Sequence, residues 1–250
     1  MFTSILKDKV ILITGGNGLI GKHIVQGAKS SGATVVNVDI GNRHNEENGE
    51  LNFDITTESG IQQLIDTVMS KYGRIDGLVN NAYPRTADWG NKVEDIKFES
   101  WQKNIDLQMN SIFLLCQKTL DIMKAQNSGS IVNIASIYGV VGNDFTLYEE
   151  YGGTSPAAYA AIKGGLINLT RYLASYYGKY NIRLNCVSPG GVLDEKQQKA
   201  SFIENYSKKS PLKRLANPEE IAPSVIFLLS DLASYITGHN LMVDGGWTAI

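Results

Sequence analysis

Short apolar runs alternate with longer amphipathic stretches along the whole chain. Six runs have the length and the apolar content of buried strands: Val10–Ile13, Thr34–Val38, Gly77–Val79, Ser130–Ile134, Ile182–Val187 and Leu241–Val243. Five stretches between them show helical spacing: Ile20–Ser31, Ile61–Tyr72, Phe98–Ala125, Pro156–Tyr180 and Glu219–Leu229. Strands separated by helices are typical of βαβ units, which build parallel sheets. The pattern therefore predicts an α/β fold with a doubly wound parallel sheet of about seven strands and helices on both faces.

No change in composition divides the 250 residues, and no repeat or low-complexity stretch interrupts them. A chain of this length buries a large core, so we expect a single domain over residues 1–250. One segment, about 194–210, mixes a few apolar residues, such as Phe202 and Tyr206, with many charges. Because its apolar stripe is short, we predict that this segment forms a mobile lid over a bound ligand.

Charge and hydropathy argue against several kinds of partner. The 23 basic and 25 acidic residues give a net charge of −2 without a long basic run, so nucleic acid and anionic membrane are poor partners. The chain shows no signal-peptide pattern and no apolar run of bilayer length, which favours a cytoplasmic protein. The three histidines share no ligand spacing, so we expect no metal. Cys116 and Cys186 each lie in an apolar run and are expected to be buried free thiols.

Glycines at positions 15, 18 and 21 separate the first predicted strand from the first predicted helix. Such a turn lets the backbone approach a pyrophosphate, which the helix N-terminus attracts, and it is typical of a Rossmann-type fold. Asp39 ends the second strand, eighteen residues after the last glycine. A carboxylate there accepts both ribose hydroxyls of NAD and repels the 2′-phosphate of NADP. NAD is therefore the expected cofactor, although Asp39 as a solvated turn residue and Arg43 as a phosphate ligand remain alternatives.

A second group of residues has the chemistry of proton transfer at an alcohol. Ser136, Tyr159 and Lys163 offer a hydroxyl, a phenol and an ammonium, and the last two are four residues apart on one helix face. A Tyr-x-x-x-Lys pair alone is weak, since a packed tyrosine with a snorkelling lysine is the alternative. Next to a dinucleotide loop, the group favours hydride transfer at a carbinol carbon, with Tyr159 as general acid/base and Ser136 orienting the oxygen. Ser155 is expected to cap the N-terminus of this helix.

These residues resemble the short-chain dehydrogenase/reductase family, and the likeness spans nearly the whole chain. Further motifs that carry it are Asn80-Asn81-Ala82, Ser188-Pro189-Gly190 and Thr237-Gly238 with Val243-Asp244-Gly245-Gly246. The resemblance implies that Asn110, Ser136, Tyr159 and Lys163 are catalytic, with Asn110 keeping a water that relays protons to Lys163. It also implies that NAD is bound by Gly15, Asn17, Gly18, Leu19, Ile20, Asp39, Asp54, Ile55, Asn80, Ala82, Tyr159, Lys163, Pro189, Gly190 and Val192.

The chain departs from the family pattern near the expected substrate site. Tyr83-Pro84-Arg85 follows the Asn-Asn-Ala motif where the family usually has glycine, and extra residues, about 143–154, lengthen the spacing between Ser136 and Tyr159. Hydroxyls and aromatic rings suit a polyhydroxylated ligand, and a guanidinium suits a phosphate or carboxylate. We therefore predict a substrate site; a self-packed surface insertion is the alternative. The predicted substrate residues are Tyr83, Arg85, Ser136, Tyr148 and Tyr151.

Three functions are compatible with these patterns. The first is an NAD(H)-dependent oxidoreductase that interconverts a secondary alcohol and a ketone of a sugar-like or phosphorylated metabolite, since the overall pattern is similar to oxidoreductases of bacterial surface-sugar and flagellin-modification clusters. The second is a 3-oxoacyl-thioester ketoreductase, which Asp39 and the near-neutral charge disfavour. The third is a non-catalytic cofactor-binding protein, which the intact catalytic set disfavours. The resemblance also implies a homotetramer that uses the two long helices and the region of Trp247.

Overall fold

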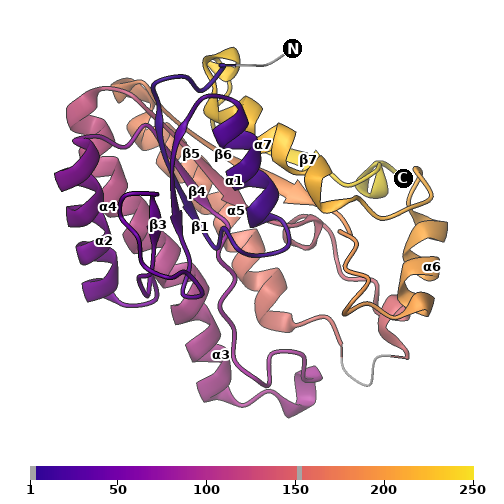
Figure 1. Cartoon of the computed structure of the whole chain (residues 1–250). Coiled ribbons are helices and arrows are strands. Elements are labelled where there is room, and N and C mark those ends of the chain that lie inside the picture. Colours follow the sequence, from indigo (N-terminus) through magenta and orange to yellow (C-terminus); the bar gives the residue numbers. More distant parts are fainter. Residues whose placement is uncertain (1–3, 151–153) are drawn as a thin grey trace.

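The computed structural model describes residues 4–150 and 154–250, so the predicted substrate residue Tyr151 lies outside the described residues (Figure 1). Seven parallel strands form one sheet in the order β3-β2-β1-β4-β5-β6-β7. The strand order reverses at β1, as in a doubly wound sheet, and the predicted fold class is confirmed. The strands are β1 Val10–Thr14, β2 Thr34–Val38, β3 Glu50–Leu51, β4 Gly77–Asn80, β5 Gly129–Ile134, β6 Ile182–Pro189 and β7 Asn240–Val243.

Helices cover both faces of the sheet (Figure 1). They are α1 Gly21–Ser30, α2 Glu58–Tyr72, α3 Phe98–Ile105, α4 Ser111–Gln126, α5 Ala157–Tyr177, α6 Ala200–Lys209 and α7 Ala222–Leu229. Alternate residues of a strand point to opposite faces. Thus Leu12 and Leu78 pack with α2, α4 and α5, whereas Ile13 and Val79 pack with α1 and α7. The core is therefore two apolar layers, one on each side of the sheet.

Three local features differ from what the sequence predicted. The predicted helix over Phe98–Ala125 is divided by a π-helical turn at Asp106–Asn110 into α3 and α4. Strand β3 was not predicted, because two residues are too short for a period-two pattern. Ser155 does not cap α5: Pro156 occupies the N-cap position without a side-chain cap, and the Ser155 hydroxyl accepts a hydrogen bond from Asn143 instead.

The segment of about 194–210, predicted as a mobile lid, contains a helix. Residues Ala200–Lys209 form α6, an amphipathic helix with Phe202 and Tyr206 buried. They pack with Leu147 and Leu215 in a small cluster of their own, separate from the two core layers. The segment therefore has regular structure in the described molecule, and its movement as a lid stays a prediction.

Among the described residues, no helix is both long enough and apolar enough to span a bilayer. Nor does that part of the chain gather three or more His, Cys, Asp or Glu side chains in a group suited to a metal ion. Cys116 and Cys186 are buried free thiols, as expected.

A buried polar ladder crosses the sheet from β4 to α5. The Asn80 side chain donates to Asn133 Oδ1 at 2.7 Å, and Asn133 Nδ2 donates to Thr170 Oγ1 at 2.8 Å. All three side chains are almost fully buried. Because unpaired polar groups are costly in the interior, this ladder holds the end of β4, β5 and α5 in one register.

We expect Asn133→Ala to lower the free energy of unfolding by about 2–3 kcal/mol, because it leaves the Asn80 amide and the Thr170 hydroxyl without their partner. Urea unfolding at a fixed protein concentration measures the change. The exposed Asn48 offers a matched control. Its replacement by Ala should change the free energy by less than about 0.5 kcal/mol. Equal losses in both variants would contradict a special role for the ladder.

Candidate active site

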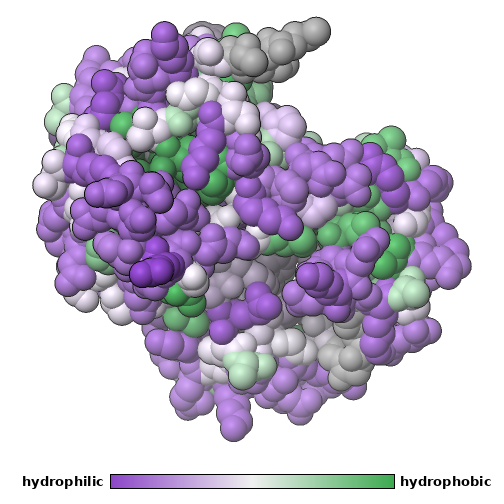
Figure 2. Space-filling view, in the orientation of Figure 1, coloured by the Kyte–Doolittle hydropathy of each residue, from purple (hydrophilic) through white to green (hydrophobic). Residues whose placement is uncertain are grey.

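The predicted functional residues gather at one edge of the sheet, where the parallel strands have their carboxyl ends. Thr14 ends β1, Asp39 follows β2, Asn80 ends β4, Ser136 follows β5, and Pro189 ends β6. Ligands of open α/β sheets bind at this edge. In the space-filling view, the molecule is hollowed between the body of the sheet and the part that carries α6 (Figure 2).

The glycine loop after β1 packs against the end of β4 too closely for side chains. A Cβ on Gly15, whose φ is +66°, would lie 2.7 Å from the Ala82 Cα, and one on Gly21 would lie 2.1 Å from the Gly15 carbonyl oxygen. Asn81 fastens the two segments, because its Nδ2 donates to the carbonyls of Thr14 at 3.1 Å and Gly15 at 2.8 Å. The loop therefore leads into α1 in a compact turn of the kind that cradles a pyrophosphate.

Asp39 is held in place beside this loop. Its Oδ2 accepts the backbone N–H of Asn17 at 3.0 Å, and its Oδ1 accepts that of Gly41 at 2.8 Å. Each carboxylate oxygen keeps a further lone pair, which is free to accept a ribose hydroxyl. Asp54 lies in the exposed turn after β3, next to Ile55, and uses only Oδ1 locally, towards Thr56. The residues present therefore fit an adenine dinucleotide along the edge from β3 to β1.

A buried polar atom at the same edge also fits a bound dinucleotide. Within the described residues, Asn80 Oδ1 is buried without a hydrogen-bond partner, although its Nδ2 is paired. Ala82, Leu19 and Ile20 are half-buried around the loop. On the other side of the edge, the Gly190 amide donates to Val243 at 3.0 Å and Val192 bridges to Ala216. These contacts form the β6 side of the expected cofactor site.

The residues predicted to transfer a proton come together from the turn after β5 and from α5. The Ser136 hydroxyl accepts the N–H of Tyr138 at 3.2 Å, which fixes it at the start of a short 3-10 turn. Tyr159 lies in the first turn of α5, and Lys163 lies one turn further on. Lys163 Nζ donates to the Ile134 carbonyl at 2.7 Å and lies 5.5 Å from the centre of the Tyr159 ring.

Burial dominates the electrostatics of this group. It raises the pKa of Tyr159 above its ordinary value, and a hydrogen bond with Ser136 opposes the rise. Burial also lowers the pKa of Lys163 to about 8. The chain by itself therefore keeps the Tyr159 phenol protonated, and its action as a base requires additional positive charge at the site.

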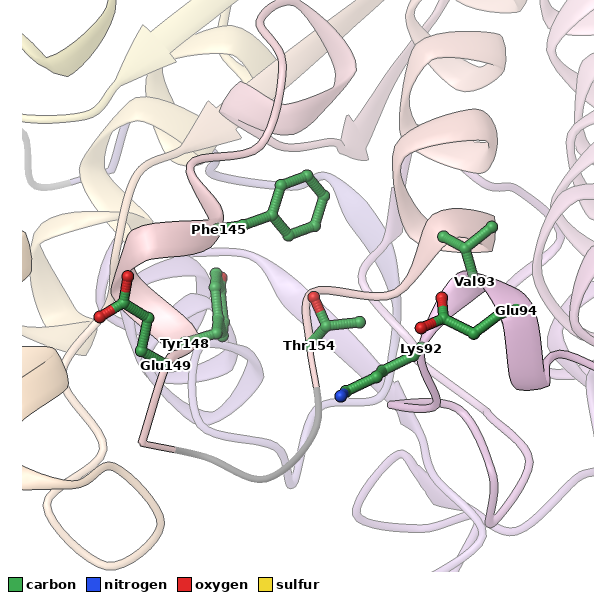
Figure 3. A pocket seen from close by; sticks show the side chains of 7 residues that line it. All are labelled: Lys92, Val93, Glu94, Phe145, Tyr148, Glu149 and Thr154. Carbon is green, nitrogen blue, oxygen red and sulfur yellow. The ribbon is translucent and has the colours of Figure 1, made fainter.

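Two neighbouring cavities open beside these residues. The inner cavity, about 230 Å³, is lined by Tyr83, Ser136, Ile137, Tyr138, Tyr148, Ser155, Pro156, Tyr159, Gly190, Gly191 and Phe202. An outer cavity of about 400 Å³ shares only Tyr148 with it and was not foreseen from the sequence (Figure 3). It is lined by Lys92, Val93, Glu94, Phe145, Tyr148, Glu149 and Thr154. The inner cavity thus joins the proton-transfer residues to Tyr83 and Tyr148, two of the predicted substrate residues.

Arg85 and Trp89 are placed differently from the pocket-lining residues. The Arg85 guanidinium lies over the Tyr83 ring, with its central carbon 5.0 Å from the ring centre, and is exposed. It does not line the inner cavity. Trp89, which sequence reasoning missed, donates its indole N–H to the Tyr83 hydroxyl at 2.7 Å. Nothing in the sequence marks Trp89 apart from its large aromatic side chain six positions after Tyr83.

Asn110 does not join the catalytic group, contrary to the expectation. Its side chain is exposed and donates to Asp106 Oδ1 at 2.6 Å. The buried face of this stretch carries Asn104 and Gln108, which are four residues apart. Gln108 lies in the π-helical turn and donates to the carbonyl of Pro84 at 2.9 Å. The helix therefore presents Gln108, rather than Asn110, to the segment that carries Tyr83.

Comparison with known proteins agrees with this geometry. A family model described as "Enoyl-(Acyl carrier protein) reductase" matches residues 17–248. The post-translational flagellin modification protein A of Campylobacter coli is 33% identical over 97% of this chain and 99% of that protein. The 3-oxoacyl-[acyl-carrier-protein] reductase FabG of Thermotoga maritima is 35% identical, with coverages of 96% and 98%.

A solved short-chain dehydrogenase from Leptospira borgpetersenii, with NAD⁺ bound, is 36% identical and superposes with a TM-score of 0.87 over 97% of this chain and 94% of that one. The chain belongs to the short-chain dehydrogenase/reductase family. It is an oxidoreductase with a Rossmann-type fold, and the family resemblance seen in the sequence is confirmed.

We expect Tyr159→Phe to lower turnover by about two to four orders of magnitude, because only the proton-carrying hydroxyl is removed. Affinity for NAD should stay within about threefold. Lys163→Ala should damage both turnover and NAD binding. Absorbance of NADH, with the best alcohol from a panel of polyols and sugars, measures turnover, and fluorescence titration measures binding. If Tyr159→Phe keeps more than about a tenth of the turnover, Tyr159 is not the proton-transfer group.

A matched pair of variants tests the side chains of the π-helical turn. Gln108→Ala should raise KM or lower kcat by about tenfold, since it frees the backbone between Tyr83 and Arg85. Asn110→Ala, two residues away on the exposed side, should change either constant by less than about threefold. A larger change in KM or kcat for Asn110→Ala than for Gln108→Ala would support the original prediction that Asn110 is catalytic.

Proposed function

We propose that the chain is an NAD(H)-dependent oxidoreductase that interconverts a secondary alcohol and a ketone of a sugar-like or phosphorylated metabolite. The observation that carries the proposal is that Ser136 and Tyr159 line the inner cavity, with Lys163 one helical turn after Tyr159 and 5.5 Å from the centre of its ring. A single domain would serve both cofactor and substrate, as a homotetramer in the cytoplasm. The residues are proposed to act as follows.

Tyr159 is the general acid/base, which takes the proton of the substrate hydroxyl or returns it to the carbonyl oxygen. Ser136 donates a hydrogen bond to the same oxygen and stabilises the charge that develops on it. Lys163 lies close to the Tyr159 ring and stabilises the phenolate, the form that burial disfavours. When bound, NAD would supply the hydride acceptor and the positive charge that the site lacks.

Asp39 supports NAD as the preferred cofactor. The carboxylate is fixed by two backbone amides and therefore has little freedom to move away from a ribose. A 2′-phosphate at this position would meet a like charge. The NAD⁺ bound in the Leptospira borgpetersenii relative is consistent with this preference.

The substrate side supports a polar metabolite. Hydroxyl-bearing side chains line much of the inner cavity, including Tyr83, Ser136, Tyr138, Tyr148 and Tyr159. Such a lining suits several hydroxyl groups on one small ring. Arg85 would add an anion contact at the outer side of Tyr83, since its guanidinium is exposed. One relative is named for the post-translational modification of flagellin, in line with the resemblance noted in the sequence.

A 3-oxoacyl-thioester ketoreductase is the second candidate, because the Thermotoga maritima relative has that name. Asp39 and the net charge of −2 disfavour it, since an acidic carrier and NADP both call for basic residues. Assay of a sugar and polyol panel with NAD, beside an acetoacetyl thioester with NADPH, separates the two. Turnover of the thioester alone would favour the second candidate.

The homotetramer rests on exposed aromatic side chains of the long helices. Phe113 on α4 and Tyr172 and Tyr176 on α5 are 45%, 65% and 56% exposed. Apolar side chains of this size gather on surfaces that meet another subunit. Light scattering at micromolar protein should therefore give an oligomer, and a monomer would contradict the proposal.

Cofactor choice can be tested directly at Asp39. NADH should bind at least about tenfold more tightly than NADPH, a difference of about 1.4 kcal/mol. Asp39→Ala should reduce the ratio of the NADPH and NADH dissociation constants. Asp54→Ala, at the expected adenine end, should weaken the binding of both cofactors by the same factor. Fluorescence titration of both reduced cofactors gives the constants. Equal or tighter NADPH binding by the unaltered protein would shift the selection to Arg43.

A further inference from the structure

Three aromatic rings meet edge to face at the inner cavity. The ring centres of Tyr83 and Tyr159 lie 5.6 Å apart, those of Tyr83 and Trp89 lie 5.7 Å apart, and those of Trp89 and Tyr159 lie 6.3 Å apart. The planes are inclined by 79–89°, the arrangement that aromatic quadrupoles favour. The phenol of Tyr83 is therefore held beside the phenol that transfers the proton.

The hydrogen bond between Trp89 and Tyr83 determines whether the Tyr83 hydroxyl is left with a donor or an acceptor for a ligand. Trp89 Nε1 lies 2.7 Å from the Tyr83 oxygen, and an indole N–H only donates. The Tyr83 oxygen is thus the acceptor in this bond, and its own proton is left for another acceptor. Tyr83 lines the inner cavity together with Ser136 and Tyr159, and a substrate in that cavity is the acceptor that we assign to this proton.

Tyr83 is suited to donate this proton in a hydrogen bond, not to remove one from the substrate. Burial raises the pKa of Tyr83 well above its ordinary value, and the neighbouring Tyr159 raises it further. The phenol therefore stays neutral in the pH range where enzymes work. Lys163 Nζ lies at similar distances from the two ring centres, 5.8 Å for Tyr83 and 5.5 Å for Tyr159. The hydroxyls differ in their partners, since that of Tyr159 is hydrogen-bonded with Ser136 and that of Tyr83 with Trp89. We therefore assign proton exchange to Tyr159 and hydrogen-bond donation to Tyr83.

Hydrogen bonds from α3 and from the π-helical turn hold the segment that carries Tyr83 and Trp89. Gln108 Nε2 holds the Pro84 carbonyl at 2.9 Å, and Asn104 Oδ1 accepts the Thr86 N–H at 3.1 Å. Asn104 Nδ2 also donates to the Thr86 hydroxyl at 2.8 Å. Both anchoring side chains are buried, so the position of Tyr83 is set before any ligand arrives.

We propose that Tyr83, positioned by Trp89, determines specificity by donating a hydrogen bond to an oxygen on the carbon next to the reacting carbinol. In the proposed function, Ser136 and Tyr159 already form hydrogen bonds to the reacting oxygen. In a cavity of about 230 Å³, a third hydroxyl donor therefore forms its hydrogen bond to an oxygen on a neighbouring carbon. The inference rests on the proposed function and narrows its substrate to vicinal diols and the matching α-hydroxy ketones. The neighbouring hydroxyl is bound and is not itself oxidised.

Two ring-matched probes test this assignment: cis-1,2-cyclohexanediol and cyclohexanol, which differ by one hydroxyl. The diol should be preferred by at least about tenfold in kcat/KM, since a site built to pair a hydroxyl discriminates against its absence. Tyr83→Phe should bring the ratio of the two probes to within about threefold. Trp89→Phe, which keeps an aromatic ring but removes the donor, should lower the ratio mainly through KM for the diol.

Tyr235→Phe is the matched control, because this tyrosine is fully exposed and remote from the cavity in sequence. It should leave the ratio unchanged. A Tyr83→Phe variant that keeps the full preference for the diol overturns the inference, and so does equal kcat/KM for both probes in the unaltered protein. In the second case, turnover itself would leave the proposed oxidoreductase function standing.

A binding measurement separates the inference from the proposed function. Calorimetric titration of each probe into the protein loaded with NADH, which leaves the alcohol without a hydride acceptor, gives the dissociation constants without turnover. Tighter binding of the diol that Tyr83→Phe abolishes supports the inference even if no NADH forms in the turnover assay, and the absence of NADH there would then count against the proposed oxidation alone. Equal binding of the two probes, or binding of neither, overturns the inference.

Discussion

Everything at the site depends on the parallel alignment of the strands, whose carboxyl ends all reach one edge of the sheet. That edge brings together a loop after β1, an acid after β2, a polar segment after β4 and a serine after β5, although more than a hundred residues separate the first from the last. The buried ladder through Asn80 and Asn133 keeps the middle strands in register. A shift of the strand register by one residue would turn the strand side chains to the other face of the sheet, and the site residues would no longer lie together.

Desolvation opposes the charged forms of Lys163 and Tyr159. The ammonium of Lys163 is held by a backbone carbonyl, and burial lowers its pKa to about 8 while raising that of Tyr159. Both shifts favour the neutral forms. A positive charge brought next to Tyr159 would oppose this shift, because it favours the phenolate, and the low polarity of the interior strengthens such an interaction. Burial raises the pKa of Tyr83 as well.

Periodicity and spacing predicted most of the fold, because six strands and the long helices each bury enough apolar residues to show a period. They could not predict β3, which has two residues, or the π-helical turn at Asp106–Asn110. Within that turn Gln108 is buried and bonds to the Pro84 carbonyl, whereas Asn110 is exposed and bonds to Asp106. The meeting of Ser136, Tyr159 and Lys163 was foreseen from motif and position together. The role of Trp89 could not be, since a hydrogen bond to Tyr83 has no sequence signature.

The side of the inner cavity that carries Phe202 is built on a separate small core. Phe202 and Tyr206 of α6 pack with Leu147 and Leu215, apart from the two layers that hold the sheet. Tyr206 stacks on Trp247 with ring centres 4.3 Å apart and accepts the Gly191 amide at 2.5 Å, so this cluster is fastened to the turn after β6. A Cβ on Gly191 would lie 2.7 Å from the Tyr206 ring, which is why that turn needs glycine. The glycine loop and Asp39 are held by other contacts, through Asn81, Asn17 and Gly41, so this cluster and the loop are fixed independently of each other.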